Sequence, residues 1–331
     1  MNIGSGAAIF GCAGLSLLPD EAAFFRDADP YGFILFGRNI DTPDQVRALT
    51  AALRAAVGRD APILIDQEGG RVQRLRAPHW REWEPPFDTV AAAGDVATAA
   101  RRMRLRAQVI AAELRAVGVD ANCAPVADVA FPLTHPFLRN RCYGSDPGLV
   151  TAVARAVADG LMAGGVIPVV KHMPGHGRSQ VDTHLDLPTV TASLDDLRAV
   201  DFAPFRALSD LPMAMTAHLV FAACDADLPA TQSPRMIRLI RDEIGFDGLL
   251  MTDDLNMEAL AGSLADRTAR SLAAGVDIAL HCKGDLAEMQ AVAAAAGVMG
   301  AATLRRAAAA LTARRAVAAD IPALMAELAD V

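Results

Sequence analysis

Short apolar runs alternate with longer amphipathic stretches along almost the whole chain. The short runs are rich in Val, Ile, Leu and Phe, and both of their faces are apolar, as in the buried strands of a parallel sheet. They predict strands over residues 7–14, 31–37, 61–69, 121–129, 167–175, 213–220, 249–256 and 277–283. The stretches between them predict helices, among them 42–57, 96–118, 193–208 and 233–244, with Ser193 and Ser233 as N-caps.

Eight strand-then-helix units in 331 residues predict a closed (β/α)8 barrel of the TIM type, in one catalytic domain over residues 1–331. A doubly wound open sheet is the alternative. No G-x-G-x-x-G motif follows the first strand, so a dinucleotide site lacks support. The Ala-rich tail, 286–331, predicts more helix, and no Pro- or Ser-rich linker separates it from the barrel.

Charge and composition narrow the possible partners and the compartment. The net charge of −8 argues against a protein that grips nucleic acid or an anionic membrane through bulk charge. No apolar run is long enough for a membrane span. The apolar N-terminal segment lacks a basic region, and Asp20 and Glu21 follow it, so we interpret it as strand and helix rather than as a signal peptide. The five cysteines form no C-x-x-C pair, which indicates reduced thiols, and we expect a cytoplasmic protein, with a monomer as the default.

Polar residues interrupt the apolar runs near the same point in successive units. In barrels of this kind the catalytic groups lie at the C-terminal ends of the strands. Buried charge costs free energy unless it is paired or functional, so any single one of these residues could equally be a structural ion pair. Their repetition favours an active site. The residues are Asp66, Glu68, Asp128, Lys171, His172, His218, Asp253 and Asp254.

The stretch over residues 169–188 carries the highest density of such groups. Pro174, Gly175 and Gly177 exclude a regular helix there and predict a shaped loop. Asp182 and His184 follow two residues apart, a spacing that lets the carboxylate fix one imidazole nitrogen and leaves the other for proton transfer. Taken alone, a loop histidine is as often only a solvated residue.

Within this stretch, KHMPGHGRSQVDTH resembles the K-H-F-P-G-H-G-x4-D-[ST]-H motif of family 3 glycoside hydrolases of the bacterial β-N-acetylglucosaminidase type. Three further segments match that family in order: IDQEGGRVQRLR (65–76), RCYGSDP (141–147) and MTDDLNM (251–257). Four ordered motifs, two of them long, make the resemblance specific, and it extends from the first strand through the seventh. The Ala-rich tail carries no diagnostic motif.

The resemblance implies a role for each matching residue. It makes Asp253 the nucleophile and His184 the general acid/base, with Asp182 as the partner of the histidine. It implies a retaining enzyme that releases terminal β-linked N-acetylglucosamine, with anhydro-muropeptides of peptidoglycan recycling as substrates and with no cofactor or metal ion. The residues that it assigns to binding the sugar are Asp66, Arg74, Arg141, Lys171 and His172.

Several positions depart from the family pattern without removing a catalytic group. Met173 replaces the usual Phe, which we expect to alter the packing under the loop; Thr252 and Asn256 each replace Ser, and Cys142-Tyr143 replaces Ser-Phe. The chemistry agrees with the residues, since a retaining glycosidase needs a carboxylate nucleophile and a second group to protonate the leaving oxygen. An imidazole, with an ordinary pKa of about 6.5, already titrates near working pH.

Other interpretations stay open at this point. Asp254 could orient the nucleophile or pair with a cation. Barrel-mouth ligands of a metal-dependent hydrolase could come from His172, His176, His184, His218 and Asp254, although no H-E-x-x-H helix is present. Lys171 could serve a Schiff-base aldolase, and a sugar-binding barrel without catalysis is a third alternative. The sequence also leaves open whether phosphate can replace water as the acceptor.

Overall fold

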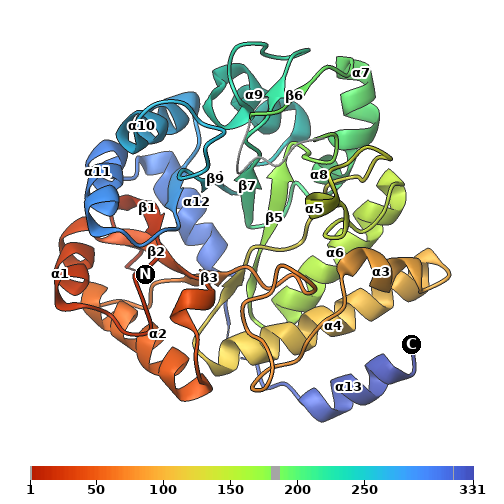
Figure 1. Ribbon diagram of the computed structural model, residues 1–331, viewed down its shortest axis with the longest axis horizontal. Helices are drawn as coiled ribbons and strands as arrows, with labels where there is room; N and C mark the ends of the chain where they lie inside the picture. Colours follow the sequence, from red (N-terminus) through yellow and green to blue (C-terminus); the bar gives the residue numbers. More distant parts are fainter. Residues whose placement is uncertain (1, 180–186, 316) are drawn as a thin grey trace.

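The computed structural model shows eight parallel strands closed into a barrel, in the order β1-β10-β9-β7-β5-β4-β3-β2 (Figure 1). The structure describes residues 2–179, 187–315 and 317–331. This closure confirms the predicted (β/α)8 barrel and rules out the open sheet. The barrel strands are β1 Gly6–Phe10, β2 Pro30–Leu35, β3 Ile63–Ile65, β4 Ala121–Asn122, β5 Ile167–Met173, β7 Met213–Thr216, β9 Leu249–Asp254 and β10 Ile278–His281.

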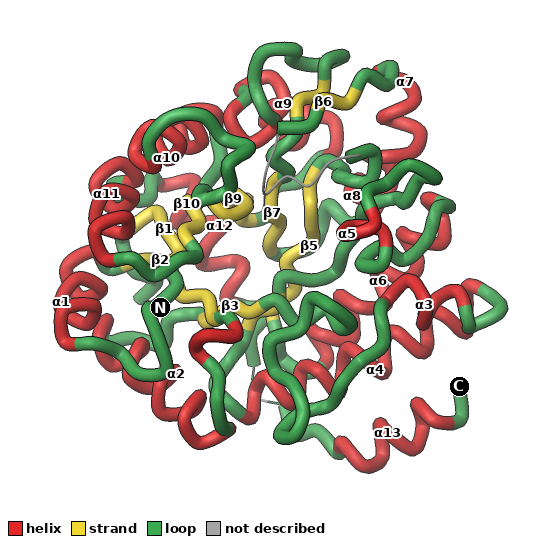
Figure 2. Tube along the Cα trace, in the orientation of Figure 1, coloured by secondary structure: helices red, strands yellow, loops and turns green. Residues whose placement is uncertain are grey.

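Helices form a ring outside the strands (Figure 2). They are α1 Pro19–Ala28, α2 Pro43–Val57, α3 Pro86–Ala91, α4 Val96–Ala116, α5 Pro136–Arg139, α6 Pro147–Ala163, α7 Leu194–Asp196, α8 Ala203–Ala207, α9 Pro234–Leu239, α10 Leu264–Ala274, α11 Leu286–Ala296, α12 Ala301–Leu311 and α13 Ile321–Ala329. Short 3₁₀ turns cover 37–39 and 230–232, and π turns cover 197–201 and 240–244. The π turns make the predicted helices over 193–208 and 233–244 irregular.

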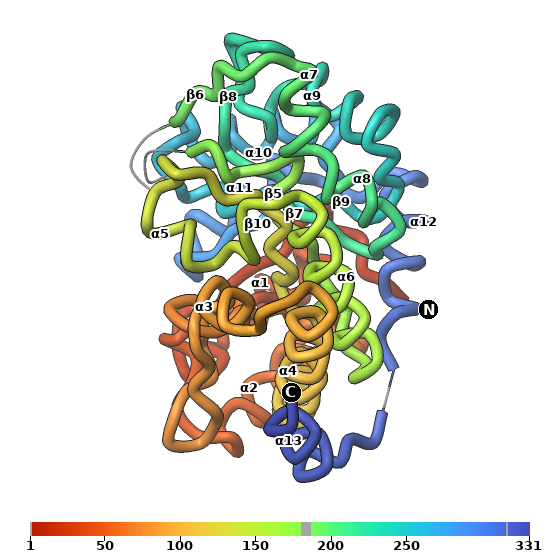
Figure 3. The backbone as a smooth tube through the Cα atoms, turned by 90° about the vertical axis from the view of Figure 1, so that its right-hand side faces the viewer, coloured from red at the N-terminus to blue at the C-terminus, as the bar shows by residue number. Residues whose placement is uncertain are grey.

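Local sequence signals explain where several helices begin. The hydroxyl of Ser193 accepts from the backbone N–H of Asp196, and that of Ser233 accepts from Met236, each at 3.1 Å. Both predicted N-caps are therefore confirmed. The tail forms α11, α12 and α13, and α13 lies along α4, where Arg101 and Glu327 pair at 2.9 Å (Figure 3).

Two apolar layers explain why the strands are apolar on both faces. Alternate residues point in opposite directions, so Ile9 and Val169 fill the barrel interior while Phe10 and Val170 pack against the helices. All four side chains are fully buried. The interior cluster also includes Leu311 and other residues of α12, so this helix packs against the barrel core.

The observed strands are shorter than the predicted ones, chiefly at their C-terminal ends. The predicted strand over 61–69 reduces to Ile63–Ile65, and the one over 121–129 reduces to Ala121–Asn122. The chain stays apolar past these points but leaves the ladder, so the polar residues lie on segments just beyond the strands. The sequence also did not predict β6 (Thr189–Val190) and β8 (Val220–Phe221), a parallel pair outside the barrel.

Two buried carboxylates anchor the N-terminal end of the barrel. Asp120, which directly precedes β4, accepts from a backbone N–H of β3 at 2.8 Å, from Arg54 at 2.8 Å and from Arg314 at 2.9 Å. Asp277, which precedes β10, pairs in the same way with Arg306 of α12 at 3.1 Å. The side chains of Asp120 and Asp277 are 1% and 3% exposed. These ion pairs attach the chain after β10 to the end of the barrel opposite the predicted site.

Substituting Asp120→Asn should therefore destabilise the protein without altering its chemistry. Loss of the carboxylate leaves Arg54 and Arg314 without their buried partner, so the free energy of unfolding should fall by about 3–5 kcal/mol. Asp60 pairs with the same two arginines but is 71% exposed, so Asp60→Asn should cost less than about 1 kcal/mol. Urea unfolding at pH 7 measures both. Equal losses would show that burial does not control this cluster.

Candidate active site

A cavity of about 310 Å³ opens at the C-terminal ends of the barrel strands. It is lined by Asp253 and by all five residues predicted to bind a sugar: Asp66, Arg74, Arg141, Lys171 and His172. Segments that are far apart in the sequence thus converge where the fold places catalytic groups. The other two predicted catalytic residues, Asp182 and His184, lie outside the described residues.

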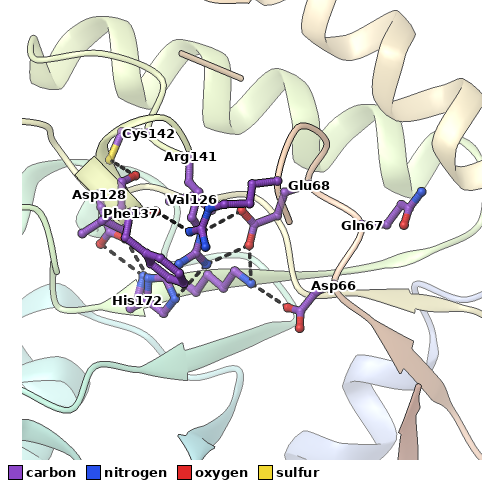
Figure 4. Close-up of polar contacts among 12 residues, drawn as sticks. Asp66, Gln67, Glu68, Val126, Asp128, Phe137, Arg141, Cys142 and His172 are labelled. Carbon is purple, nitrogen blue, oxygen red and sulfur yellow. Dashed lines mark hydrogen bonds and ion pairs between the residues drawn. The ribbon is translucent and has the colours of Figure 1, made fainter. Parts of the chain in front are cut away.

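Lys171 is at the centre of a charged cluster in this cavity, and Figure 4 labels Asp66, Glu68 and Arg141 of that cluster. Its Nζ donates to Asp66 Oδ1 at 2.8 Å and lies 2.7 Å from Glu68 Oε1. Arg141 donates from Nε and Nη2 to both oxygens of Glu68, at 2.9 and 2.8 Å, and Arg74 donates to Asp66 Oδ2 at 3.1 Å. The side chains of Lys171 and Glu68 are each 2% exposed. Two carboxylates and three cations therefore satisfy one another before any ligand binds.

The cluster keeps its members charged. Burial acts to raise the pKa of Asp66, but Lys171 and then Arg74 hold it well below its usual value. Burial acts on Glu68 in the same way, and Arg141 and Lys171 keep the pKa of Glu68 low. Burial would lower the pKa of Lys171, yet Asp66 and Glu68 raise it above its ordinary value. A Schiff-base lysine must be neutral to attack a carbonyl, so the aldolase alternative does not fit this site.

A buried carboxylate fixes the predicted sugar-binding histidine. Asp128 is fully buried, and its Oδ2 lies 2.7 Å from His172 Nδ1, while its Oδ1 accepts from the backbone N–H of His172 and of His176. The Nδ1–H of His172 therefore points to Asp128, and its Nε2 lies 3.4 Å from Arg141 Nη2. Sequence reasoning placed Asp128 at a strand end but gave it no role.

Close backbone contacts shape the loop that follows β5. A Cβ on Gly177 would lie 1.7 Å from the carbonyl oxygen of Val129, so only glycine fits there. Met173 beneath it is fully buried in the outer core, where it takes the place of the usual aromatic ring. His176 is buried on the cavity wall, and burial, with the neighbouring His172, lowers its pKa to about 4.

Asp253 is the second-to-last residue of strand β9, and its surroundings keep its carboxylate charged. Burial acts to raise its pKa, but His172 and the hydrogen bond from the backbone N–H of Asp254 keep it below the usual value. Its Oδ1 accepts from the backbone N–H of Asp254 at 2.8 Å. The neighbouring Asp254 also lines the cavity, and burial raises its pKa; its Oδ1 accepts from the backbone N–H of Asn256 and of Cys282.

The described residues do not support the metal-hydrolase alternative. They contain no group of three or more His, Cys, Asp or Glu side chains that could hold a metal ion. His218, one of the proposed ligands, is instead bonded to the backbone carbonyl of Asp254 and to Thr231. His281 and Glu288 pair with each other at 3.1 Å.

Several cavity residues come from loops that sequence reasoning did not single out. Phe36 follows β2, Arg71 follows β3, and His135 and Phe137 precede or begin α5. Arg71 lies within the IDQEGGRVQRLR motif, but no periodicity or motif marks Phe36, His135 or Phe137, because such loop positions are set by the tertiary fold. No helix among the residues that the structure describes is both long and apolar enough to span a membrane. All five cysteines are free thiols, and four of them are buried.

Known proteins are similar to this chain over most of its length. Residues 21–314 match the family model described as the N-terminal domain of glycosyl hydrolase family 3. A β-hexosaminidase from Stenotrophomonas maltophilia (strain R551-3) is 37% identical over 287 residues, which cover 85% of this chain and 84% of that protein. The structure of NagZ from Neisseria gonorrhoeae in complex with N-trifluoroacetyl-D-glucosamine superposes with a TM-score of 0.88 at 29% identity, covering 99% of this chain and 98% of that chain. A family 3 β-N-acetylglucosaminidase from Paenibacillus sp. FPU-7 gives a TM-score of 0.86 at 29% identity, over 98% of this chain and 67% of that chain.

Removing the central cation of the cluster should produce a pH-dependent loss of stability. Lys171→Met leaves Asp66 and Glu68 buried with fewer cations, so unfolding free energy should fall by about 3–5 kcal/mol at pH 7. Both carboxylates have lowered pKa values in the folded wild type, so the stability they contribute is present above about pH 4 and is lost as pH falls. Without the ammonium of Lys171 the pKa of each buried carboxylate should rise, so the folded variant binds protons at a higher pH than wild type does, and the difference in stability should shrink between pH 7 and pH 4.

Urea unfolding at pH 4, 5.5 and 7 measures this difference. Lys283 pairs with Glu288 at 2.9 Å but is 63% exposed, so Lys283→Met is a matched control that should change stability little at any pH. A loss in Lys171→Met that stays the same from pH 7 to pH 4 would contradict the assignment of charge to the cluster.

Proposed function

The chain belongs to glycosyl hydrolase family 3 and is a glycoside hydrolase of its β-hexosaminidase type, and we propose that it removes terminal β-linked N-acetylglucosamine with retention of configuration. The observation that carries this proposal is Asp253, a charged carboxylate at a strand end that shares one cavity with the Lys171 cluster. The Neisseria relative is described in complex with N-trifluoroacetyl-D-glucosamine, an N-acylated amino sugar, which supports the substrate class.

The proposed reaction is a double displacement. One oxygen of Asp253 is held by the N–H of Asp254, and the other attacks the anomeric carbon as the bond to the leaving oxygen breaks. His184, oriented by Asp182, gives its proton to that leaving oxygen. His184 then takes a proton from water, the water oxygen bonds to the anomeric carbon, and the electron pair of the ester bond returns to Asp253. Each step conserves protons without any metal or cofactor.

The charged cluster is the proposed binding site for the sugar hydroxyls and acetamido group. Asp66, Arg74, Arg141, Lys171 and His172 offer charged donors and acceptors, which make stronger hydrogen bonds than neutral groups. Because these residues already hold one another in place, little order has to be created when the sugar binds. The ion pairs among these residues are compatible with sugar binding, because the same five residues line the cavity.

The cavity also supports exo action on a small substrate. Its volume of about 310 Å³ lies at the lower end of the range for ligand sites, which suits one sugar residue at the end of a chain. We propose anhydro-muropeptides of peptidoglycan recycling as the substrates and the cytoplasm as the compartment. The five free thiols fit a reducing environment. We further propose that the enzyme acts as a monomer.

The nucleophile can be tested by covalent trapping. A slowly hydrolysed fluorosugar inactivator should label Asp253, identified by digestion and mass spectrometry, because the ester is an obligatory intermediate. Asp253→Asn should lose about 10³-fold or more in rate with every leaving group. Asp254→Asn is the matched comparison, since it should keep the label on Asp253. A label on Asp254 or Glu68 would refute the assignment.

The role of His184 can be tested through its dependence on the leaving group. A nitrophenolate leaves without protonation, so its glycosylation rate should survive in His184→Ala, whereas a sugar leaving group should react about 10²- to 10⁴-fold more slowly. Azide needs no general base, so it should accelerate turnover of the activated substrate and yield the β-azide. Asp182→Asn should show the same pattern more weakly, because the imidazole is misoriented but present. Equal losses for both leaving groups, without azide rescue, would move the role to Glu68 or Asp254.

A further inference from the structure

His218 is a fully buried histidine beside the nucleophile that does not line the cavity. It follows β7, and its Nε2 lies 3.1 Å from the backbone carbonyl oxygen of Asp254. A carbonyl oxygen can only accept a hydrogen bond, so Nε2 carries the proton and donates it. His218 therefore reaches the end of β9 through a main-chain group and has no direct path to a bound sugar.

Two threonines fix the other side of the ring. His218 Nδ1 lies 2.8 Å from the hydroxyl of Thr231, which lies 2.8 Å from the hydroxyl of Thr216 and 3.1 Å from the carbonyl of Ala217. All of these side chains are fully buried. Burial lowers the pKa of His218, which favours the neutral ring. In the neutral ring Nδ1 accepts the single hydrogen of the Thr231 hydroxyl, which then cannot also donate to the Ala217 carbonyl, and Thr231 in turn accepts from Thr216.

Four hydrogen bonds hold Asp254, two at its carbonyl and two at its side chain. Its carbonyl accepts from His218 and from the backbone N–H of Met257, each at 3.1 Å, and its Oδ1 accepts from the backbone N–H of Asn256 at 3.1 Å and of Cys282 at 3.2 Å. The remaining polar group of its backbone, the N–H, donates to Asp253 Oδ1 at 2.8 Å. The direction of this N–H, and with it the rotation of the Asp253 carboxylate, depends on how firmly the other contacts hold residue 254.

We propose that His218 is a positioning residue, which aims the Asp253 carboxylate at the anomeric carbon through the backbone of Asp254. This inference rests on the proposed role of Asp253 as nucleophile. In the first step Asp253 forms the ester bond with the oxygen that the N–H leaves free. In the second step the electron pair of that bond returns to the carboxylate, and the same N–H stabilises the charge on Oδ1. A misplaced residue 254 should therefore slow both steps while sugar binding is unchanged.

Two substitutions at His218 separate this role from simple packing. Asn approximates the position of Nδ1, so His218→Asn can keep the contact with Thr231 but cannot reach Asp254. Gln is one methylene longer, so His218→Gln can place an amide N–H near the position of Nε2. His281→Asn is the matched control, because His281 is also fully buried, at the end of the adjacent strand β10, and bonds to Glu288 rather than to Asp254.

The experiment measures four quantities in the full-length protein: the rate constant for inactivation by the fluorosugar, the steady-state kcat, the inhibition constant of N-acetylglucosamine and the melting temperature. His218→Asn should lower the inactivation rate constant and kcat by about 10- to 100-fold, the usual effect of a misplacement near 1 Å. The inhibition constant should stay within about 2-fold of wild type, since a positioning defect leaves binding intact. His218→Gln should recover most of the rate, and His281→Asn should not reproduce the loss.

Each contrary result is distinguishable. If folded His218→Asn keeps the wild-type inactivation rate, or if Asn and Gln lose rate equally together with weaker inhibitor binding, His218 is only structural and the inference is wrong. If wild-type protein is labelled at a residue other than Asp253, the proposed nucleophile fails before any variant is considered. Should His218→Asn not fold, Thr231→Val removes the partner of Nδ1 without changing side-chain shape, and its failure to slow inactivation would overturn the inference equally.

Discussion

The ammonium group of Lys171, buried between two carboxylates, is the interaction on which the architecture of the site depends. A buried cation is tolerated only with partners, and Asp66 and Glu68 supply them from the segment after β3. Glu68 in turn anchors Arg141, which reaches His172. One charge therefore draws together the segments that follow β3 and β4 and the strand β5. The cluster is rigid because each member makes a hydrogen bond and an ion pair with another member. It stays charged because neutralising one member would leave an opposite charge unpaired in the interior.

The two ends of the barrel use the same kind of interaction for different purposes. At the N-terminal end, Asp120 and Asp277 are surrounded by arginines and by strand N–H groups, and neither lines the cavity at the other end of the barrel. At the C-terminal end, Asp66 and Lys171 form equally close pairs on the wall of a cavity. Close ion pairing therefore does not identify a functional residue. What separates the two groups is access to a ligand.

The sequence predicted the barrel because its strands are apolar on both faces, as Ile9 with Phe10 and Val169 with Val170 illustrate. It predicted the N-caps at Ser193 and Ser233 because the capping contact is local. It extended the strands too far, since apolar character continues where the ladder ends, and it missed β6 and β8, which pair only through tertiary structure. The motif residues that the structure describes line one cavity, but the contact of Asp128 with His172 spans 44 residues, and no spacing rule reveals it.

Two adjacent aspartates in one cavity pose an electrostatic problem that the structure resolves by giving them different surroundings. If both carboxylates were fully charged they would repel each other, and neither could be held close to the other without cost. His172 and the N–H of Asp254 lower the pKa of Asp253, whereas burial and the charge of Asp253 raise that of Asp254. Asp253 therefore loses its proton at a lower pH than Asp254, and the carboxyl of Asp254 accepts hydrogen bonds from the backbone. Environments that push neighbouring pKa values apart are how active sites give similar side chains different tasks. The order of the two residues also matters, because Asp254, as the residue after the proposed nucleophile, donates its own N–H to Asp253 while its carboxyl accepts from the N–H of Asn256 in the turn after β9.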